Sequence, residues 1–211
     1  MFQYIVIEGP IGVGKTSLTR LLAEEFNARC FLEKPEGNPF LPHFYEDREK
    51  YAFQAQIFFL LNRFRQQKEI SQPDLFKQTT LCDYLFAKDR IFAYLNLDND
   101  ELALYEQIYN LLKGQILSPD LVIYLQAKSD ILLSRIKSRN VPYEKDIDLE
   151  YLKTVTEAYN YYFFHYNRTP LLVVNTSEID FVNRKDDFSQ LVREIEQMQR
   201  GTWHFIPMRS K

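Results

Sequence analysis

The sequence lacks several features on which common classes of protein depend. Only two of its 211 residues are cysteine, and Cys30 and Cys82 are not at a metal-ligand spacing, so we expect two free thiols with no metal site between them. No apolar run approaches the roughly 20 residues of a membrane-spanning helix. The formal net charge of -3 creates no positive field for a nucleic acid polymer or an anionic membrane. We therefore expect no binding to either.

The length of the chain suits one well-buried domain, residues 1–211, and is short for two. Hydrophobic residues make up 45% and charged residues 26% of the chain, as in ordinary globular proteins. The apolar residues 2–7 have no basic leader and run directly into a glycine-containing segment, which favours a buried strand over a signal peptide. We therefore expect a cytoplasmic protein.

Strand patterns alternate with helix patterns along most of the chain. Strands are expected at residues 2–8, 28–32, 79–83, 121–125 and 171–174, and helices at residues 15–26, 51–70, 100–117, 130–139 and 149–166. This alternation predicts an α/β fold with a five-stranded parallel sheet covered by helices on both faces. Ligands of such sheets bind at the carboxyl ends of the strands. The tail from residue 201 onward either packs back or extends away.

The segment GPIGVGKT at residues 9–16 fits the phosphate-binding P-loop, and it lies between a predicted strand and a predicted helix as that motif requires. Its glycines let backbone N–H groups surround phosphate, its lysine reaches the β- and γ-phosphates, and its threonine hydroxyl can bind Mg²⁺. The fold is therefore expected to be that of a P-loop NTPase. The expected ATP-binding residues are Gly9, Gly12, Gly14, Lys15, Thr16 and Ser17.

The P-loop predicts nucleotide binding but not the reaction. GTPase switches, motor ATPases and small-molecule kinases all contain this motif. A GTPase would ordinarily have an Asn-Lys-x-Asp stretch that reads the base, and the sequence has none. This favours a kinase.

Further blocks resemble the deoxynucleoside kinase family, which includes deoxycytidine, deoxyguanosine and bacterial deoxyadenosine kinases. They are EGPIGVGKT at 8–16, EKP at 33–35, YAFQAQ at 51–56 followed by Arg63, KDRIFA at 88–93, and RIKSR at 135–139 followed by Glu144. The blocks occur in the family's order over roughly three quarters of the chain. The resemblance implies an enzyme that uses ATP and Mg²⁺ and forms a homodimer.

The resemblance implies that Glu33 is the general base for the nucleoside 5′-hydroxyl. A lone carboxylate after the second predicted strand suits this chemistry, and Glu36 is the competing acid. The resemblance also assigns Gln56 and Asp89 to reading the base, with Arg63 paired to Asp89. Without the resemblance, Gln56 and Arg63 would be interpreted as the polar face of a helix.

The resemblance also implies a sugar site and a lid. Tyr45 and Glu144 match the pair that holds the sugar 3′-hydroxyl. Arg135 and Arg139 are four positions apart, at i and i+4, and so share one helical face. In the family they are lid arginines that converge on the transferring phosphoryl group. An isolated pair of this kind would be interpreted as a solvated basic face.

Two positions depart from the family pattern. An acid–arginine pair is expected after the third strand, but Tyr84 follows Asp83, and Val141 replaces a third lid arginine. Asp83 can still act on Mg²⁺ through water. Either Lys88 or Arg90 supplies the missing charge, or the enzyme is slower or differs in its substrate.

These observations predict ATP-dependent phosphorylation of the 5′-hydroxyl of a deoxynucleoside, as in nucleotide salvage. A purine deoxynucleoside or deoxycytidine is favoured over thymidine, because Arg63 and Asp89 are retained. Residues 38–41 and the region of Tyr45 look most like the bacterial deoxyadenosine kinases. The alternatives are a nucleoside monophosphate kinase similar to thymidylate kinase, and a catalytically impaired regulatory protein that binds nucleotides.

Overall fold

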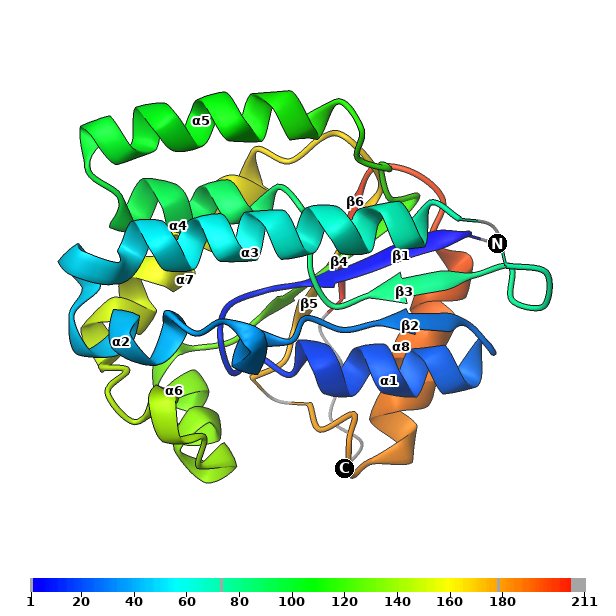
Figure 1. Cartoon of the computed structure of the whole chain (residues 1–211). Helices are drawn as coiled ribbons and strands as arrows, with labels where there is room; N and C mark the ends of the chain where they lie inside the picture. Colours follow the sequence, from blue (N-terminus) through cyan, green and yellow to red (C-terminus); the bar gives the residue numbers. More distant parts are fainter. Residues whose placement is uncertain (1, 73, 178, 206–211) are drawn as a thin grey trace.

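A six-stranded, entirely parallel sheet forms the centre of the computed structural model, which describes residues 2–72, 74–177 and 179–205. The strands run in the order β2-β3-β1-β4-β5-β6, so β1 lies between two strands that follow it far along the chain (Figure 1). Their bounds are β1 (Tyr4–Glu8), β2 (Arg29–Phe31), β3 (Thr80–Cys82), β4 (Leu121–Gln126), β5 (Leu171–Asn175) and β6 (Thr202–Phe205).

The sheet has one strand more than the five predicted. The additional strand, β6, pairs in parallel with β5 and places Trp203 beside Leu172. Three of its four residues are exposed, because it is an edge strand and one of its sides has no neighbouring strand. Its four residues, Thr-Trp-His-Phe, alternate polar and aromatic side chains, but an alternation this short is weak evidence for a strand. The five predicted strands are all present in the fold.

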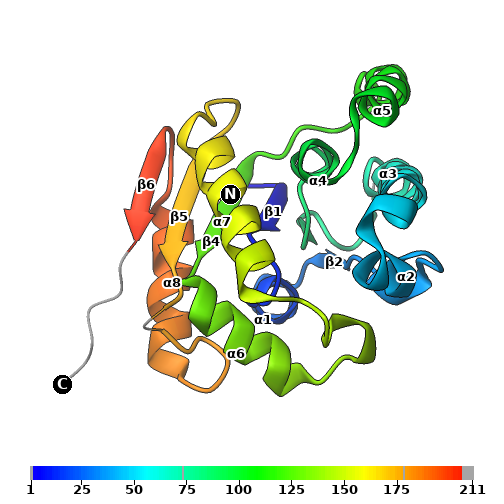
Figure 2. The same ribbon diagram turned by 90° about the vertical axis from the view of Figure 1, so that its left-hand side faces the viewer.

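Helices cover both faces of the sheet (Figure 2). The first face carries α1 (Lys15–Glu25) and α8 (Lys185–Gln197). The second face carries α3 (Arg48–Ile70), α4 (Lys88–Asn96) and α7 (Leu149–Phe164), with α5 (Asn99–Lys113) packed outside α3 and α4. In the part of the chain that the structure describes, no helix is both long and apolar enough to cross a membrane.

The remaining helices gather beyond the carboxyl ends of the strands (Figure 1). They are α2 (Leu41–Glu46), α6 (Ser129–Arg139) and two single turns of 3₁₀ helix, η1 (Pro35–Gly37) and η2 (Pro142–Glu144). Since α2 contacts both α3 and η2, these segments form a wall around the end of the sheet where this fold binds its ligands.

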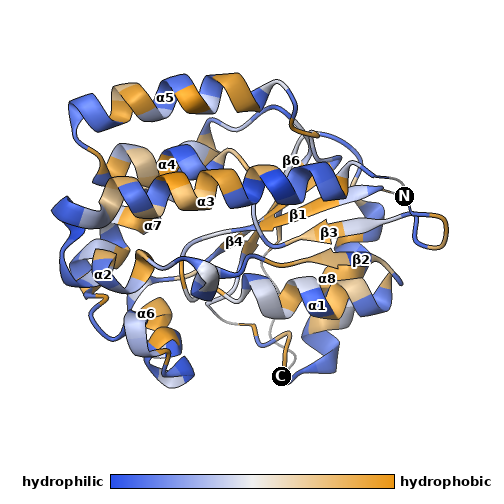
Figure 3. Cartoon of the chain, in the orientation of Figure 1, coloured by the Kyte–Doolittle hydropathy of each residue, from blue (hydrophilic) through white to orange (hydrophobic). Residues whose placement is uncertain are grey.

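The core is formed by the strands and the helix faces turned toward them. The strands are the most continuously apolar part of the chain (Figure 3), and β1 and most of β4 are buried. Aromatic side chains fill the space between β4 and α7, where the rings of Tyr124 and Phe163 stack with their centroids 4.1 Å apart. This packing fixes α7, whose Tyr159 donates its hydroxyl to the carboxylate of Glu8 at the end of β1, at 3.1 Å.

Candidate functional site

The P-loop connects β1 to α1, at the point where the strand order reverses on either side of β1. Gly9 is required there because a Cβ atom would lie 2.5 Å from the carbonyl oxygen of Leu125. Gly14 has a φ of 103° directly before the helix, in the left-handed region that side chains disfavour. The buried carboxylate of Glu8 accepts the backbone N–H of Gly9 at 2.8 Å and that of Leu85 at 2.6 Å. These contacts hold the loop open over the N-terminus of α1.

The side chain of Lys15 lies across the loop that a phosphate would occupy. Its Nζ donates to the carbonyl oxygens of Gly9 at 2.7 Å and Pro10 at 3.1 Å. Burial, followed by the charge of Lys88, lowers the pKa of Lys15 to about 8. An anionic phosphate group would stabilise the charged form of this lysine.

Thr16 and Asp83 form the oxygen-rich corner of the site. The hydroxyl of Thr16 donates to Asp83 at 2.6 Å, and the other carboxylate oxygen of Asp83 accepts the backbone N–H of Glu33 at 2.6 Å. Burial, followed by the charge of Glu33, raises the pKa of Asp83. Hydroxyl and carboxylate oxygens fit Mg²⁺, which is commonly held by one or two protein groups together with water and substrate phosphates. Among the described residues, no cluster of three or more His, Cys, Asp and Glu could hold a metal alone.

Glu33 follows β2 and faces the P-loop across a cavity. Its carboxylate lies 2.6 Å from Nη2 of Arg63 and 2.9 Å from Nζ of Lys88. Burial alone would raise the pKa of Glu33, but the charges of Arg63 and then Lys88 outweigh it and lower the pKa to about 2. The competing acid, Glu36, is exposed on η1 and does not line the cavity. The structure therefore places Glu33, and not Glu36, beside the phosphate loop.

The three residues expected to read the base lie together. Gln56 Nε2 donates to the carbonyl oxygen of Asp89 at 2.8 Å and also bonds its carboxylate, while Arg63 bonds the second carboxylate oxygen. The hydroxyl of Tyr105 on α5 donates to Asp89 at 2.9 Å, a contact that no sequence pattern indicated. Only Arg63 of the three expected residues lines the cavity. Gln56 and Asp89 bond to one another directly behind it.

The two residues expected to bind the sugar also line this cavity. Tyr45 comes from α2 and Glu144 from η2. The ring of Tyr45 lies almost parallel to that of Tyr143, with 6.4 Å between centroids. Both carboxylate oxygens of Glu144 accept from Nη2 of Arg139 at 2.6 Å. This part of the cavity therefore presents a phenol, a carboxylate and a guanidinium.

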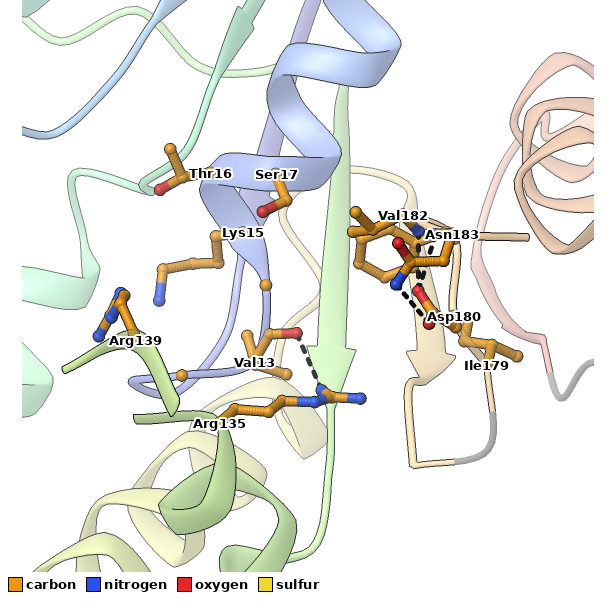
Figure 4. Close-up of a pocket in the computed structure, with 13 residues that line it drawn as sticks. Val13, Lys15, Thr16, Ser17, Arg135, Arg139, Ile179, Asp180, Val182 and Asn183 are labelled. Carbon is orange, nitrogen blue, oxygen red and sulfur yellow. Dashed lines mark hydrogen bonds between the residues drawn. The ribbon is translucent and has the colours of Figure 1, made fainter. Parts of the chain in front are cut away.

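A second cavity lies on the other side of the P-loop (Figure 4). It is lined by the loop from Gly12 to Ser17, by Arg135 and Arg139, and by residues 179–183 after β5. We call it the donor cavity, and the cavity with Glu33 the acceptor cavity. Lining residues common to both are Gly12, Lys15, Thr16 and Arg139. The segment 179–183 was not predicted as part of the site, because neither its composition nor its spacing has a recognisable motif.

The two arginines expected to form the lid, Arg135 and Arg139, point in different directions (Figure 4). Arg139 lies on the side of Lys15 and lines both cavities. Arg135 lines only the donor cavity, where its guanidinium donates to the carbonyl oxygen of Thr176 at 2.8 Å and to that of Val13 at 3.4 Å. The expected convergence of the two guanidinium groups on one phosphoryl group is not present in this structure.

The structure also distinguishes between the two candidates for the missing charge. Tyr84 is fully buried in the core, and Val141 lines neither cavity. Arg90 bonds Glu106 at 2.7 Å and the hydroxyl of Tyr94 at 3.0 Å, outside both cavities. The other candidate, Lys88, lines the acceptor cavity.

Comparison with known proteins agrees with this geometry. Residues 5–200 match the family described as Deoxynucleoside kinase. The chain is 34% identical over 200 residues to a deoxyguanosine kinase of Bacillus subtilis, covering 92% of this chain and 97% of that protein. It is 31% identical over 214 residues to a deoxyadenosine kinase of Lactobacillus acidophilus, covering 95% and 98%. The solved deoxyadenosine kinase from M. mycoides with dCMP and dCDP bound superposes with a TM-score of 0.81 at 27% identity, covering 93% of this chain and all of that one.

Proposed function

The chain belongs to the deoxynucleoside kinase family and is a kinase that uses ATP to phosphorylate deoxynucleosides, and we propose that the 5′-hydroxyl is the acceptor. The observation that carries the proposal is the meeting of the two cavities at Lys15, Thr16 and Arg139. ATP would occupy the donor cavity and the nucleoside would occupy the acceptor cavity. The γ-phosphoryl group of ATP would then lie where the two cavities meet.

The proton of the 5′-hydroxyl would pass to Glu33. A general base must lie within hydrogen-bond reach of the proton that it removes, and Glu33 lines the acceptor cavity together with Lys15 and Thr16 of the P-loop. Lys15 and Arg139 would neutralise charge on the transferring phosphoryl group. Since a transfer of this kind depends on positioning and electrostatic stabilisation, these preorganised cations are the main contribution of the protein.

Thr16 and Asp83 would hold Mg²⁺, the first through its hydroxyl and the second through water. Magnesium supplies positive charge to the phosphate oxygens when it is bound. The hydrogen bond of 2.6 Å between Thr16 and Asp83 keeps both oxygens at the P-loop. The backbone N–H of Glu33 fixes the orientation of the Asp83 carboxylate, so the metal site and the proposed base are connected.

We propose a purine deoxynucleoside as the preferred substrate, with deoxycytidine as the second choice. Gln56 and Asp89 are hydrogen-bonded to one another in this structure. A nucleobase that replaced part of this network could use the same hydrogen-bond donors and acceptors. The named relatives include deoxyguanosine and deoxyadenosine kinases, which supports this choice. Tyr45 and Glu144 would hold the 3′-hydroxyl of the sugar.

Two different functions fit the acceptor cavity less well. A nucleoside monophosphate kinase needs extra cations at the acceptor site for a phosphate already on the acceptor. Arg63 of the acceptor cavity is bonded to both Glu33 and Asp89, and Tyr84 stands where a further arginine was expected. A catalytically impaired regulatory protein would not be expected to keep Lys15, Thr16 and Glu33 together at one cavity. No specific observation favours either of these functions.

The family resemblance also supports four further proposals. The enzyme would consist of a single domain, form a homodimer, reside in the cytoplasm and take part in the salvage of nucleotides. Light scattering after gel filtration would test the dimer, with twice the mass of one chain as the expected result. The mass of a single chain at micromolar concentration would contradict it.

A substrate panel tests the function. ATP consumption with Mg²⁺ would be measured against deoxyguanosine, deoxyadenosine, deoxycytidine, thymidine and dTMP at equal concentrations. We expect the highest kcat/KM with a purine deoxynucleoside and formation of its monophosphate. A clear preference for thymidine would contradict the substrate assignment, and activity with dTMP alone would identify a monophosphate kinase.

A further inference from the structure

Lys88 occupies a position at the acceptor cavity that its sequence context does not explain. It is the first residue of α4, and its side chain is almost completely buried. Its Nζ lies 2.9 Å from Oε2 of Glu33, and it lines the same cavity as Lys15 and Thr16. Burial of an ammonium group is unfavourable unless it is paired and hydrogen-bonded, and Glu33 is the partner that compensates the burial of Lys88.

The ammonium group of Lys88 has hydrogen bonds left to make. It carries three N–H donors, and within the described part of the chain its Nζ makes one hydrogen bond, to Glu33. The two remaining donors are beside the carboxylate to which the 5′-hydroxyl must come. A phosphoryl oxygen arriving next to Glu33 would therefore meet a fixed positive charge with donors for it.

The other cations of the acceptor cavity are held in different places. Arg63 is bonded on one side by Glu33 and on the other by Asp89, and Arg139 is held at the sugar end by Glu144. Lys15 lies over the carbonyl groups of the P-loop. Lys88 differs from all three, because its Nζ bonds the proposed base and, among the described residues, no other group, so two of its three donors stay free beside that base.

We propose that Lys88 is a catalytic residue that donates hydrogen bonds to the phosphoryl group as it passes from ATP to the nucleoside 5′-oxygen. This inference rests on the proposed function. In the step, the proton of the 5′-hydroxyl moves to Glu33, the bond between the 5′-oxygen and the γ-phosphorus forms, and the bond from that phosphorus to the β,γ-bridging oxygen breaks. The electron pair of the broken bond leaves with ADP. Lys88 keeps its proton and stabilises charge on a non-bridging oxygen.

The test compares steady-state kinetics of the wild-type enzyme with those of Lys88→Met, Lys88→Arg and Lys34→Met. Lys34 is exposed and adjacent to Glu33 in the chain, so it is a matched control that should behave as the wild type. Loss of one preorganised donor typically lowers kcat by about 10² to 10³-fold, and we expect this for Lys88→Met, with KM for ATP and nucleoside changed less than about threefold. The kcat of Lys88→Arg should be at least about tenfold higher than that of Lys88→Met.

A second set of variants separates catalysis from folding. Lys88→Gln keeps a donor for Glu33 but removes the charge, and Lys88→Ala leaves space for ethylammonium. We expect Lys88→Gln to bind ADP with aluminium fluoride, a mimic of the transferring phosphoryl group, at least about tenfold more weakly than the wild type, and ethylammonium to raise kcat of Lys88→Ala saturably.

The outcomes distinguish this inference from the proposed function. A folded Lys88→Met enzyme with kcat within about threefold of an active wild type would overturn the role of Lys88 alone. Lost activity that neither Lys88→Arg nor ethylammonium recovers, with unchanged binding of ADP and aluminium fluoride by Lys88→Gln, would mean that Lys88 is structural. A wild-type chain that transfers no phosphoryl group to any deoxynucleoside would overturn the proposed function as well.

Discussion

The guanidinium group of Arg63 contacts one carboxylate oxygen of Glu33, Oε1, through two nitrogen atoms, with Nε at 2.7 Å and Nη2 at 2.6 Å. Its remaining nitrogen, Nη1, bonds Asp89. One buried cation therefore links the proposed base to the network that would read the nucleobase. We therefore expect a change at Arg63, on the long helix α3, to affect both catalysis and substrate choice.

Removal of Arg63 should destabilise the fold strongly. In Arg63→Ala, the buried carboxylate of Asp89 loses its cation, and loss of one partner of a buried pair costs about 3–5 kcal/mol. The free energy of unfolding from urea titration measures this loss. The control is Arg48→Ala, since Arg48 and Asp148 form a more exposed pair at 3.5 Å, and the expected loss is about 1 kcal/mol or less. Equal losses in the two variants would contradict the proposed importance of Arg63.

The ion pairs of Glu33 should also make stability depend on acid pH. The pKa of Glu33 is lowered from 4.5 to about 2 in the folded chain, so the ionised group stabilises the fold above pH 4.5 and this contribution is lost as the pH falls toward 2. Glu33→Gln removes the contribution at every pH. The gap in unfolding free energy between wild type and variant should therefore narrow from pH 6 to pH 3. A gap that stays constant over this range would show that Glu33 is not ion-paired.

Asp83→Asn should weaken the use of magnesium. The carboxylate of Asp83 accepts the hydroxyl of Thr16, and loss of such an outer ligand typically lowers metal affinity by about 10 to 100-fold. The concentration of free Mg²⁺ that gives half-maximal rate should rise accordingly. Asp130→Asn, which changes an exposed acid at the start of α6, should leave it unchanged. An unaltered magnesium requirement in Asp83→Asn would remove Asp83 from the metal site.

Tyr45→Phe should weaken recognition of the sugar 3′-hydroxyl. The phenol lines the acceptor cavity together with Glu144, and a single neutral hydrogen bond corresponds to about 2 to 10-fold in kcat/KM. The effect should be seen with a deoxynucleoside and vanish with its 2′,3′-dideoxy analogue, which lacks the hydroxyl. An equal effect with both substrates would assign Tyr45 to packing against Tyr143.

Much of the site could be predicted from local sequence. The P-loop is continuous in the chain, and the apolar run of residues 2–8 before it places it at a strand end. The positions of Glu33 and Asp83 follow from the same rule, since both come directly after predicted strands and the carboxyl ends of parallel strands meet at one edge. The structure brings both carboxylates to Thr16 and Lys15, as expected.

What could not be predicted depends on contacts between distant segments. The choice between Lys88 and Arg90 requires the direction of α4, because residues two apart on a helix point to different sides. The direction of Arg135 depends on Thr176, which lies 41 residues further along the chain. Strand β6 has only four residues and lies at the edge of the sheet, so its short alternation of polar and aromatic residues was too weak to predict a strand. Each of these features is determined by packing and not by local sequence.

In the proposed reaction, Glu33 takes a proton from the 5′-hydroxyl as ATP transfers its γ-phosphoryl group. The most direct test is a single-turnover experiment with ATP labelled in the γ-phosphate, the preferred purine deoxynucleoside, and three enzymes: wild type, Glu33→Gln and Glu36→Gln. Glu36 is exposed and does not line the acceptor cavity, so it is a matched control.

We expect label in the 5′-monophosphate for the wild type and Glu36→Gln at similar rates. Glu33→Gln should be slower by about 10² to 10⁴-fold, the usual contribution of a general base, while nucleoside binding by calorimetry remains within about tenfold. Transfer by Glu33→Gln at the wild-type rate, or label at a position other than the 5′-oxygen, would contradict the account.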